Sequence, residues 1–291
     1  MAGSGGVVLA GGRSSRMGAP KSALEWHGST LLRRTVGIVG RAAGGPVVVV
    51  RAVGQQLPEL PPGTIVVDDP RPGKGPLQGI AAGLGALAGL ADRSRAGERP
   101  EFAFVCSTDL PFLHPAFIGR VLALLREDGA DVALPVARGY RQPLAAGYRV
   151  SLAEAAEALV AADRLRPAFL FDQCAVTRLN EARLRQDPVL SAVDPELDSV
   201  LNVNQPADYQ AARVRPAPLV TVQILGAIPA GPVTVRAATV RAAATAAGLA
   251  PGGPVAVTLN GRPSDGDGEI PLATGDAVLF CRSASSQGSP S

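Results

Sequence analysis

Five short apolar runs mark the first half of the chain, and none of them alternates with polar positions. They are residues 6–10 (GVVLA), 46–50 (PVVVV), 64–68 (TIVVD), 102–109 (FAFVCSTD) and 130–136 (ADVALPV). Continuous apolar runs of this length are typical of parallel strands that are covered on both faces. The pattern therefore predicts five buried, mostly parallel strands.

Longer segments with helical spacing separate these runs. Residues 29–42 begin at a Ser29–Thr30 cap and carry an apolar stripe, and residues 75–91 contain Pro76 where a first helical turn would start. Two more helices are expected over residues 114–128 and 151–164. Strands that alternate with helices predict a three-layer, Rossmann-like α/β domain with a mostly parallel sheet.

The composition and the pattern of predicted elements change after residue 212. Residues 213–218 hold two prolines among polar neighbours and are predicted to be a linker. Residues 219–283 then show short strands, one helix that ends near Gly248, and an Asn260–Gly261 turn, which indicates a small α+β domain. The domains expected are thus 1–212 and 219–283, with a disordered polar tail at 284–291.

Composition and charge narrow the classes of partner. The chain has 291 residues, 46% of them hydrophobic, and a formal net charge of +3. Its basic residues form only short clusters such as Arg33–Arg34, so no nucleic-acid partner is expected, whereas a small anionic ligand remains possible.

Cysteines and apolar segments bear on the compartment. Three cysteines lie far apart without a CxxC pair, which argues against a disulfide framework and a zinc site. The first residues, MAGSGG, lack the basic region of a secretory signal, and residues 79–91 are too short and glycine-rich to span a bilayer. A cytoplasmic protein without a membrane partner is expected.

A glycine-rich stretch, LAGGRSSRMGAPK at residues 9–21, directly follows the first predicted strand. Bare backbone amides in such a turn can surround a phosphate, and Arg16 and Lys21 add positive charge. The alternative is a solvated loop whose glycines only turn the chain. Asp109 ends another buried strand, where it suits an Mg²⁺ ion beside substrate phosphates, or else simply forms a turn.

Two asparagines later in the chain, Asn202 and Asn204, lie two residues apart and would share one side of an extended segment. Their amides suit a polar substrate or a hydrated metal, and the alternative is plain loop capping. Only two histidines are present, which removes most histidine-based catalysis, and neither a G-x-S-x-G nor a G-x-x-x-x-G-K-[ST] motif occurs.

Taken in order, these segments resemble the molybdenum cofactor guanylyltransferase family over roughly residues 5–212. The matching motifs are L-A-G-G-x-S-x-R-M-G-x-x-K, an acidic loop with G-P-L-x-G, D-x-P-F, Q-P-L and N-V-N-x-P-x-D. Here they fall at Leu9–Lys21, Asp69 with Gly75–Gly79, Asp109–Phe112, Gln142–Leu144 and Asn202–Asp208. The resemblance implies a nucleotidyltransferase fold and Mg²⁺-dependent transfer of GMP from GTP to molybdopterin or its molybdenum form.

The resemblance also implies roles for individual residues. Nucleotide binding would fall to Leu9, Ala10, Gly11, Gly12, Lys21, Asp69 and Asp109. Asp109 would hold the Mg²⁺ ion, Lys21 and Arg16 would act in catalysis, and Gln142, Asn202 and Asn204 would lie on the pterin side. One position departs from the family, since Arg51 stands where an asparagine often ends the second strand.

Other activities of the same fold stay open. In the families that this chain resembles, L-A-G-G accompanies GTP and L-A-A-G accompanies CTP, so Gly11–Gly12 favours GTP. A cytidylyltransferase, or a nucleotidyltransferase with another phosphorylated acceptor, is the first alternative. A non-catalytic protein that binds or delivers the cofactor is the second, and the presence of both Lys21 and Asp109 counts against it.

The C-terminal module resembles the β-grasp, ubiquitin-like sulfur carriers, including the small subunit of molybdopterin synthase and the thiamine-pathway carrier. The resemblance rests on VAVTLNG at 255–261 and GDAVLF at 275–280. Those carriers end in Gly-Gly, whereas this sequence ends in SQGSPS, so sulfur transfer is not expected. We expect either a unit that docks molybdopterin synthase or a molybdoenzyme, or a degenerate carrier, and the alternative is a structural appendage.

Overall fold

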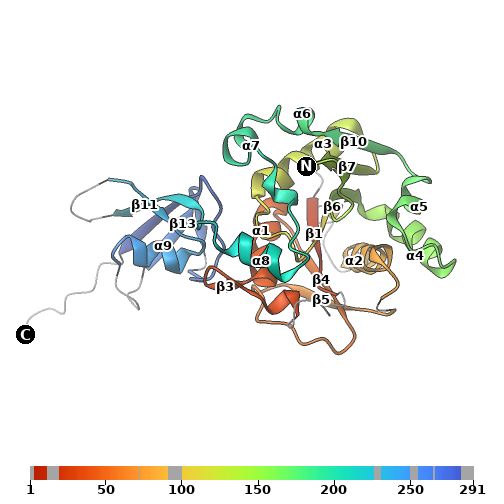
Figure 1. Cartoon of the computed structure of the whole chain (residues 1–291), viewed down its shortest axis with the longest axis horizontal. Coiled ribbons are helices and arrows are strands. Elements are labelled where there is room, and N and C mark those ends of the chain that lie inside the picture. The colour runs from red at the N-terminus through yellow and green to blue at the C-terminus, as the bar shows by residue number, and fades with distance from the viewer. Residues whose placement is uncertain are drawn as a thin grey trace, which may run out of the picture. The chain divides into compact units, whose positions relative to one another are not determined.

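The computed structural model describes residues 3–11, 20–71, 73–90, 100–225, 231–249, 255–264 and 266–282. The chain divides into two compact units (Figure 1). The main boundary along the sequence lies between Ala212 and Arg213, and the short segment His27–Ser29 groups with the C-terminal unit. Each unit has its own sheet and its own hydrophobic core.

The N-terminal unit is built on an eight-stranded, mostly parallel sheet. Its strands follow the order β10-β7-β9-β6-β1-β4-β5, and β8 pairs with β7. Strand β1 lies between β4 and β6 and is parallel to both. The strands are β1 (Gly3–Leu9), β4 (Val47–Ala52), β5 (Ile65–Asp69), β6 (Pro100–Ser107), β7 (Val132–Ala137), β8 (Tyr140–Arg141), β9 (Ala145–Arg149) and β10 (Val176–Asn180).

The four longer helices of this unit match the segments predicted from the sequence. Thr30 caps the first of them by accepting a hydrogen bond from the Arg33 backbone amide. The helices are α1 (Leu31–Ala43), α2 (Pro76–Leu90), α3 (Pro115–Asp128), α4 (Ala153–Ala161), α5 (Pro167–Phe171), α6 (Glu181–Leu184), α7 (Pro188–Val193) and α8 (Pro206–Arg213). None of the helices in the described part of the chain has the length and apolar character that crossing a bilayer requires.

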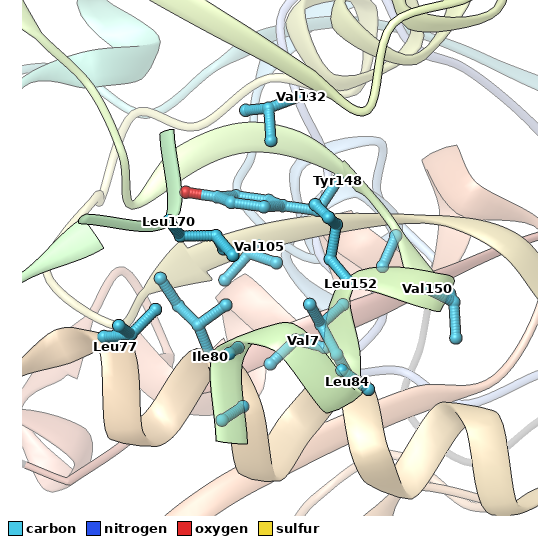
Figure 2. Packing of buried hydrophobic residues seen from close by; sticks show 14 of the residues in the cluster. Val7, Leu77, Ile80, Leu84, Val105, Val132, Tyr148, Val150, Leu152 and Leu170 are labelled. Carbon is cyan, nitrogen blue, oxygen red and sulfur yellow. The ribbon is translucent and has the colours of Figure 1, made fainter. Parts of the chain in front are cut away.

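Helices cover both faces of the sheet, and glycines let two of them approach closely. A Cβ at Gly83 of α2 would lie 2.2 Å from a Val7 methyl, and a Cβ at Gly6 of β1 would lie 2.1 Å from a Val39 methyl of α1. Adjacent residues of a strand point to opposite faces, so α1 and α2 lie on opposite sides of β1. Figure 2 shows the core on the α2 side, where Leu77, Ile80 and Leu84 pack toward the sheet.

One strand inside the sheet, β9, was not predicted from the sequence. Strand β9 lies between β6 and β7 and is antiparallel to both. Its sequence, AAGYR, is short, contains a glycine and lacks the β-branched residues that favour strands, so the sequence alone does not indicate a strand here. Its place in the sheet is stabilised by burial, since Ala145, Ala146 and Tyr148 are all buried.

The C-terminal unit holds a five-stranded sheet in the order β12-β11-β15-β13-β14, with β11 and β15 parallel at its centre. Helix α9 (Val240–Ala246) packs on one face, where Val222, Val278 and Phe280 form the core. Asn260 and Gly261 both have positive φ, as the predicted hairpin turn requires. The strands are β11 (Leu219–Leu225), β12 (Val233–Arg236), β13 (Val255–Leu259), β14 (Arg262–Ser264) and β15 (Ala277–Arg282).

Candidate active site

The carboxyl ends of β1, β4, β5 and β6 meet at one edge of the large sheet, because these strands are mutually parallel. Leu9, the last residue of β1, pairs with Ser107, the last residue of β6. Thr108 connects the end of β6 to the end of β1, because its backbone amide and its hydroxyl both donate to the Leu9 carbonyl, at 3.2 and 3.0 Å. The residues that follow β6 therefore start from a fixed position beside β1.

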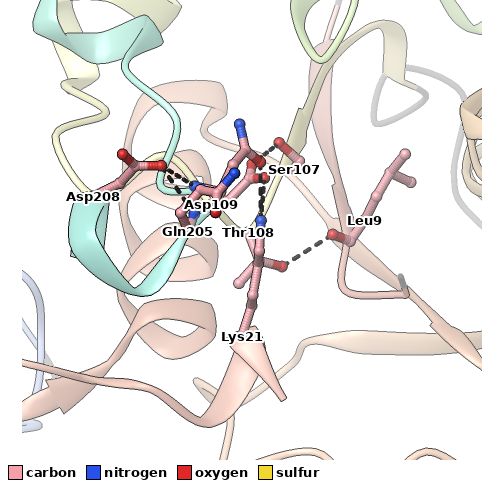
Figure 3. Close-up of polar contacts among 8 residues, drawn as sticks. Leu9, Lys21, Ser107, Thr108, Asp109, Gln205 and Asp208 are labelled. Atoms are coloured by element: carbon pink, nitrogen blue, oxygen red, sulfur yellow. Dashed lines mark hydrogen bonds and ion pairs between the residues drawn. The ribbon is translucent and has the colours of Figure 1, made fainter. Parts of the chain in front are cut away.

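Three side chains that are distant in sequence converge at this edge. The Lys21 ammonium lies 3.1 Å from Asp109 Oδ2 and 3.0 Å from Asn204 Oδ1. The other Asp109 oxygen, Oδ1, accepts a hydrogen bond from the Ser107 hydroxyl. Figure 3 shows Lys21 pointing toward the end of β6, where Asp109 and Ser107 lie. The structure thus brings together the lysine and the carboxylate that the sequence singled out.

The start of α8 holds Asn204 in place. Asp208, in the first turn of that helix, accepts hydrogen bonds from the Asn204 and Gln205 backbone amides at 3.1 and 2.9 Å. A carboxylate here satisfies amides that have no partner within the helix. The Val203 amide also donates to the Asp109 carbonyl at 3.0 Å, which fastens this segment to the segment after β6.

A small apolar cluster lies beneath the three polar side chains. Trp26 comes from the short hairpin of β2 (Glu25–Trp26) and β3 (Ser29–Thr30), and it meets Phe112 edge to face at a centroid distance of 5.4 Å. Val203 and Tyr209 pack into the same cluster. The segments that carry Lys21, Asp109 and Asn204 therefore share one core, which limits their relative movement.

Other candidate residues lie elsewhere along the edge. Asp69 ends β5, two strands from β1, which is about 10 Å at ordinary strand spacing. One of its oxygens accepts from the Arg71 amide at 2.9 Å and shapes the turn that leads to α2. The side-chain amide of Gln142 donates to the Ala137 carbonyl of its own hairpin at 3.2 Å. Asn202 is exposed.

The glycine-rich stretch is described only at its two ends. Leu9, Ala10 and Gly11 leave β1 beside the end of β4, and the Ala10 and Gly11 amides both donate to the Val50 carbonyl. Lys21 starts a short 3₁₀ helix, Lys21–Ala23. The candidate residues Gly12 and Arg16 lie outside the described residues.

The end of β4 carries side chains whose part at this edge was not foreseen. Arg51 forms an ion pair with Asp68, 2.7 Å from Nε to Oδ1, and its Nη1 donates to the Gln55 carbonyl at 3.2 Å. Gln55 in turn contacts Ala10. Gln55 stands in a loop without a recognisable motif, so no sequence signal could have pointed to it.

The Cys106 thiol beside the site is not suited to act as a nucleophile. Cys106 precedes Ser107 on β6, and burial raises the pKa of its thiol, with the nearby Asp109 carboxylate adding to the shift. The thiol is therefore neutral and inert at physiological pH. No group of three His, Cys, Asp or Glu side chains that could hold a metal occurs among the described residues.

A mostly parallel sheet with an aspartate after β6, and with a glycine-rich sequence following β1, is typical of an α/β nucleotidyltransferase fold. The chain belongs to the MobA-like NTP transferase domain family, which its residues 6–178 match. A crystal structure of molybdopterin-guanine dinucleotide biosynthesis protein A from Archaeoglobus fulgidus has this fold as well. The two align with a TM-score of 0.54 at 22% identity, over 72% of this chain and 96% of the other.

Curated relatives from mycobacteria are more similar in sequence. A protein of Mycobacterium tuberculosis (strain H37Rv) named "Probable molybdenum cofactor guanylyltransferase" is 40% identical over 176 residues, which are 60% of this chain and 82% of the relative. A protein of Mycobacterium ulcerans with the same name is 39% identical over 213 residues, covering 72% of this chain and 93% of the relative. The small C-terminal unit lies beyond the family match.

Proposed function

We propose that this protein transfers GMP from GTP to molybdopterin, or to its molybdenum form, and releases pyrophosphate. The observation that carries the proposal is the convergence of Lys21, Asp109 and Asn204 at the carboxyl edge of the sheet. The names of the mycobacterial relatives supply the donor and the acceptor. The Gly11–Gly12 pair of the first motif favours GTP over CTP.

The reaction needs position and charge neutralisation more than acid–base chemistry. An oxygen of the terminal phosphate of molybdopterin forms a bond to the α-phosphorus of GTP, while the bond from that phosphorus to the bridging oxygen of the β-phosphate breaks. The bonding electrons leave with pyrophosphate, whose growing negative charge Lys21 would offset. Asn204 would orient the acceptor at the same point, because its amide already faces the Lys21 ammonium.

The residues at this edge fit a magnesium ion that the substrate helps to hold. Mg²⁺ takes one or two carboxylates together with phosphate oxygens and waters, and Asp109 offers a carboxylate beside the end of β1. When bound, the ion would polarise the α-phosphate and neutralise charge on the leaving group. Asp109 would hold it, and Ser107 would keep the carboxylate oriented by donating to Oδ1.

A transfer assay tests the proposed function. We expect stoichiometric pyrophosphate when the protein is mixed with Mg²⁺, molybdopterin and GTP, and at least tenfold slower release with CTP, ATP or UTP. Omitting molybdopterin is the control for simple hydrolysis. Faster pyrophosphate release with CTP than with GTP would indicate a cytidylyltransferase. Binding of molybdopterin without pyrophosphate release from any nucleotide would indicate a delivery protein.

For the C-terminal unit we propose a β-grasp domain that docks molybdopterin synthase. The mixed sheet with β11 and β15 parallel at its centre, and α9 on one face, supports this assignment. On β11 the alternation that buries Val220 and Val222 leaves Leu219 and Leu225 about half exposed, at 44% and 49%. We place the contact with the synthase at these two side chains, which share one side of β11.

Docking is tested by capture of purified molybdopterin synthase on the immobilised full-length chain. The wild type is expected to retain the synthase, and the Leu219→Lys/Leu225→Lys double variant to lose at least tenfold in affinity. Val189→Lys, at another exposed apolar residue that lies in the N-terminal unit, is the control and should bind normally. Failure of the wild type to bind would leave the C-terminal unit as a structural appendage.

A further inference from the structure

The turn after β4 places one side chain against both flanks of the glycine-rich stretch. Strand β4 ends at Ala52. The backbone amide of Gln55 closes a four-residue turn by donating to the Ala52 carbonyl at 3.0 Å. Gly54 occupies the third position with φ of +76°, which suits glycine there in a type II turn. This turn brings the side chain of Gln55 back over the end of the strand.

The side-chain amide of Gln55 contacts three segments of the chain. Its Oε1 accepts from the Ala52 backbone amide at 3.0 Å, which fixes its orientation. Its Nε2 donates to the Ala10 carbonyl at 3.0 Å and lies 3.5 Å from the Ser22 hydroxyl. Ala10 precedes residues 12–19 and Ser22 follows them, so a single donor group meets both flanks of the stretch.

The surroundings make this arrangement rigid. Arg51 Nη1 donates to the Gln55 carbonyl, and the Arg51 ion pair with Asp68 ties the turn to β5. Gly11 lies against the same strand end, since a Cβ there would sit 3.4 Å from the Ala52 nitrogen. The side chain of Ser22 is buried, so the approach of Gln55 occurs in a partly dry environment where hydrogen bonds are stronger.

We propose that Gln55 is a positioning residue that joins Ala10 to Ser22 and so sets the position of Lys21 relative to the end of β1, where the triphosphate would bind. It acts through Ala10 on one flank and through Ser22, the neighbour of Lys21, on the other. The inference rests on the proposed function for the identity of the ligand as a nucleoside triphosphate. Arg51, which departs from the family pattern, supports this arrangement through its bond to the Gln55 carbonyl.

The first test measures nucleotide binding. Gln55→Leu removes both the donor and the acceptor, and Gln55→Glu keeps an acceptor for the Ala52 amide but loses the donor. For each we expect the Kd for GTP with Mg²⁺, measured by calorimetry without acceptor, to rise about tenfold. In the transfer assay the KM for GTP should rise by the same factor while the KM for molybdopterin stays within twofold. Gln56→Leu, at the exposed neighbour, is the matched control and should match the wild type.

The second test needs no nucleotide. Amide hydrogen exchange at Ala10 and Gly11, both bonded to the Val50 carbonyl, should accelerate at least fivefold in Gln55→Leu and not in Gln56→Leu. Wild-type values in either test overturn the proposal. A wild-type protein that binds GTP but transfers nothing would refute the proposed function alone, because binding and exchange would still report on Gln55.

Discussion

Asp109→Ala is expected to lower the rate of nucleotidyl transfer by at least about 10³-fold, measured as pyrophosphate release at saturating GTP and molybdopterin. The variant removes the carboxylate at the centre of the site, which contacts Lys21 through one oxygen and Ser107 through the other. The proposed metal site would then lose its carboxylate, and Lys21 loses the group that directs it toward the end of β6.

The fold should tolerate this change. The Asp109 and Lys21 side chains are largely buried, at 15% and 23% exposure, but Lys21 keeps Asn204 as a hydrogen-bond partner when Asp109 is removed. The bonds that hold the segment use other groups, namely the Thr108 hydroxyl and the Val203 and Thr108 backbone amides. We therefore expect the thermal midpoint to stay within a few degrees of that of the wild type.

Two further variants, one at Asp109 and one at a distant aspartate, separate the loss of charge at the site from a general effect on the fold. Asp109→Asn keeps the shape but removes the charge, and it should lose nearly as much activity as Asp109→Ala. Asp172→Asn makes the same chemical change at an exposed aspartate after α5 and should leave activity unchanged. Near-normal transfer by Asp109→Ala under limiting Mg²⁺ would refute the assignment of Asp109 as the metal-holding residue.

Lys21→Met should reduce kcat/KM for GTP by about 10²-fold to 10³-fold, with a smaller effect on the KM for molybdopterin. The methionine retains the length of the side chain but cannot offset negative charge on the leaving pyrophosphate. Lysine is rare in this chain, which contains only Lys21 and Lys74 among 28 basic residues. A compact ammonium differs from a planar guanidinium in charge distribution and reach, so Lys21→Arg should recover only part of the activity.

Lys74→Met is the matched control for the lysine. Lys74 pairs at 3.0 Å with Asp163, and both side chains are at least half exposed. It should behave as the wild type in steady-state kinetics and in thermal unfolding. Because Lys21 and Asp109 are in direct contact, the double variant Lys21→Met/Asp109→Ala should lose less than the product of the two single losses. Full additivity would indicate that the two residues act in separate places.

The strands and helices around the site were predictable because their signals are local. The apolar runs that became β1, β4, β6 and β7 are largely buried, and burial on both faces leaves no polar alternation in the sequence. The run that became β5 was predicted to be buried as well, and this was wrong, because β5 is an edge strand of the sheet that leaves Val66 40% exposed. Thr30 and Pro76 marked helix starts by the chemistry of their own side chains. Strand β9 was missed because its place depends on neighbours 40 residues away, at β6, rather than on its own residues.

The candidate site divides in the same way. Lys21 and Asp109 could be named from the sequence, because a glycine-rich turn after a strand and an aspartate at a strand end are local patterns with known chemistry. Their contact depends on the parallel pairing of β1 with β6 and on the apolar cluster around Trp26 and Phe112. The sequence also gave no reason to connect Asn204 to Lys21, 183 residues earlier.

The amino-acid sequence by itself determined the class of fold of the N-terminal unit and the residue types available for phosphate and metal. Only the tertiary structure decided which of these residues meet, since hydrogen bonds such as those of Gln55 to Ala10 and Ser22 join segments that no local pattern relates. The physical reason is that backbone preferences act over a few residues, whereas the site is assembled by strand order and by shared burial.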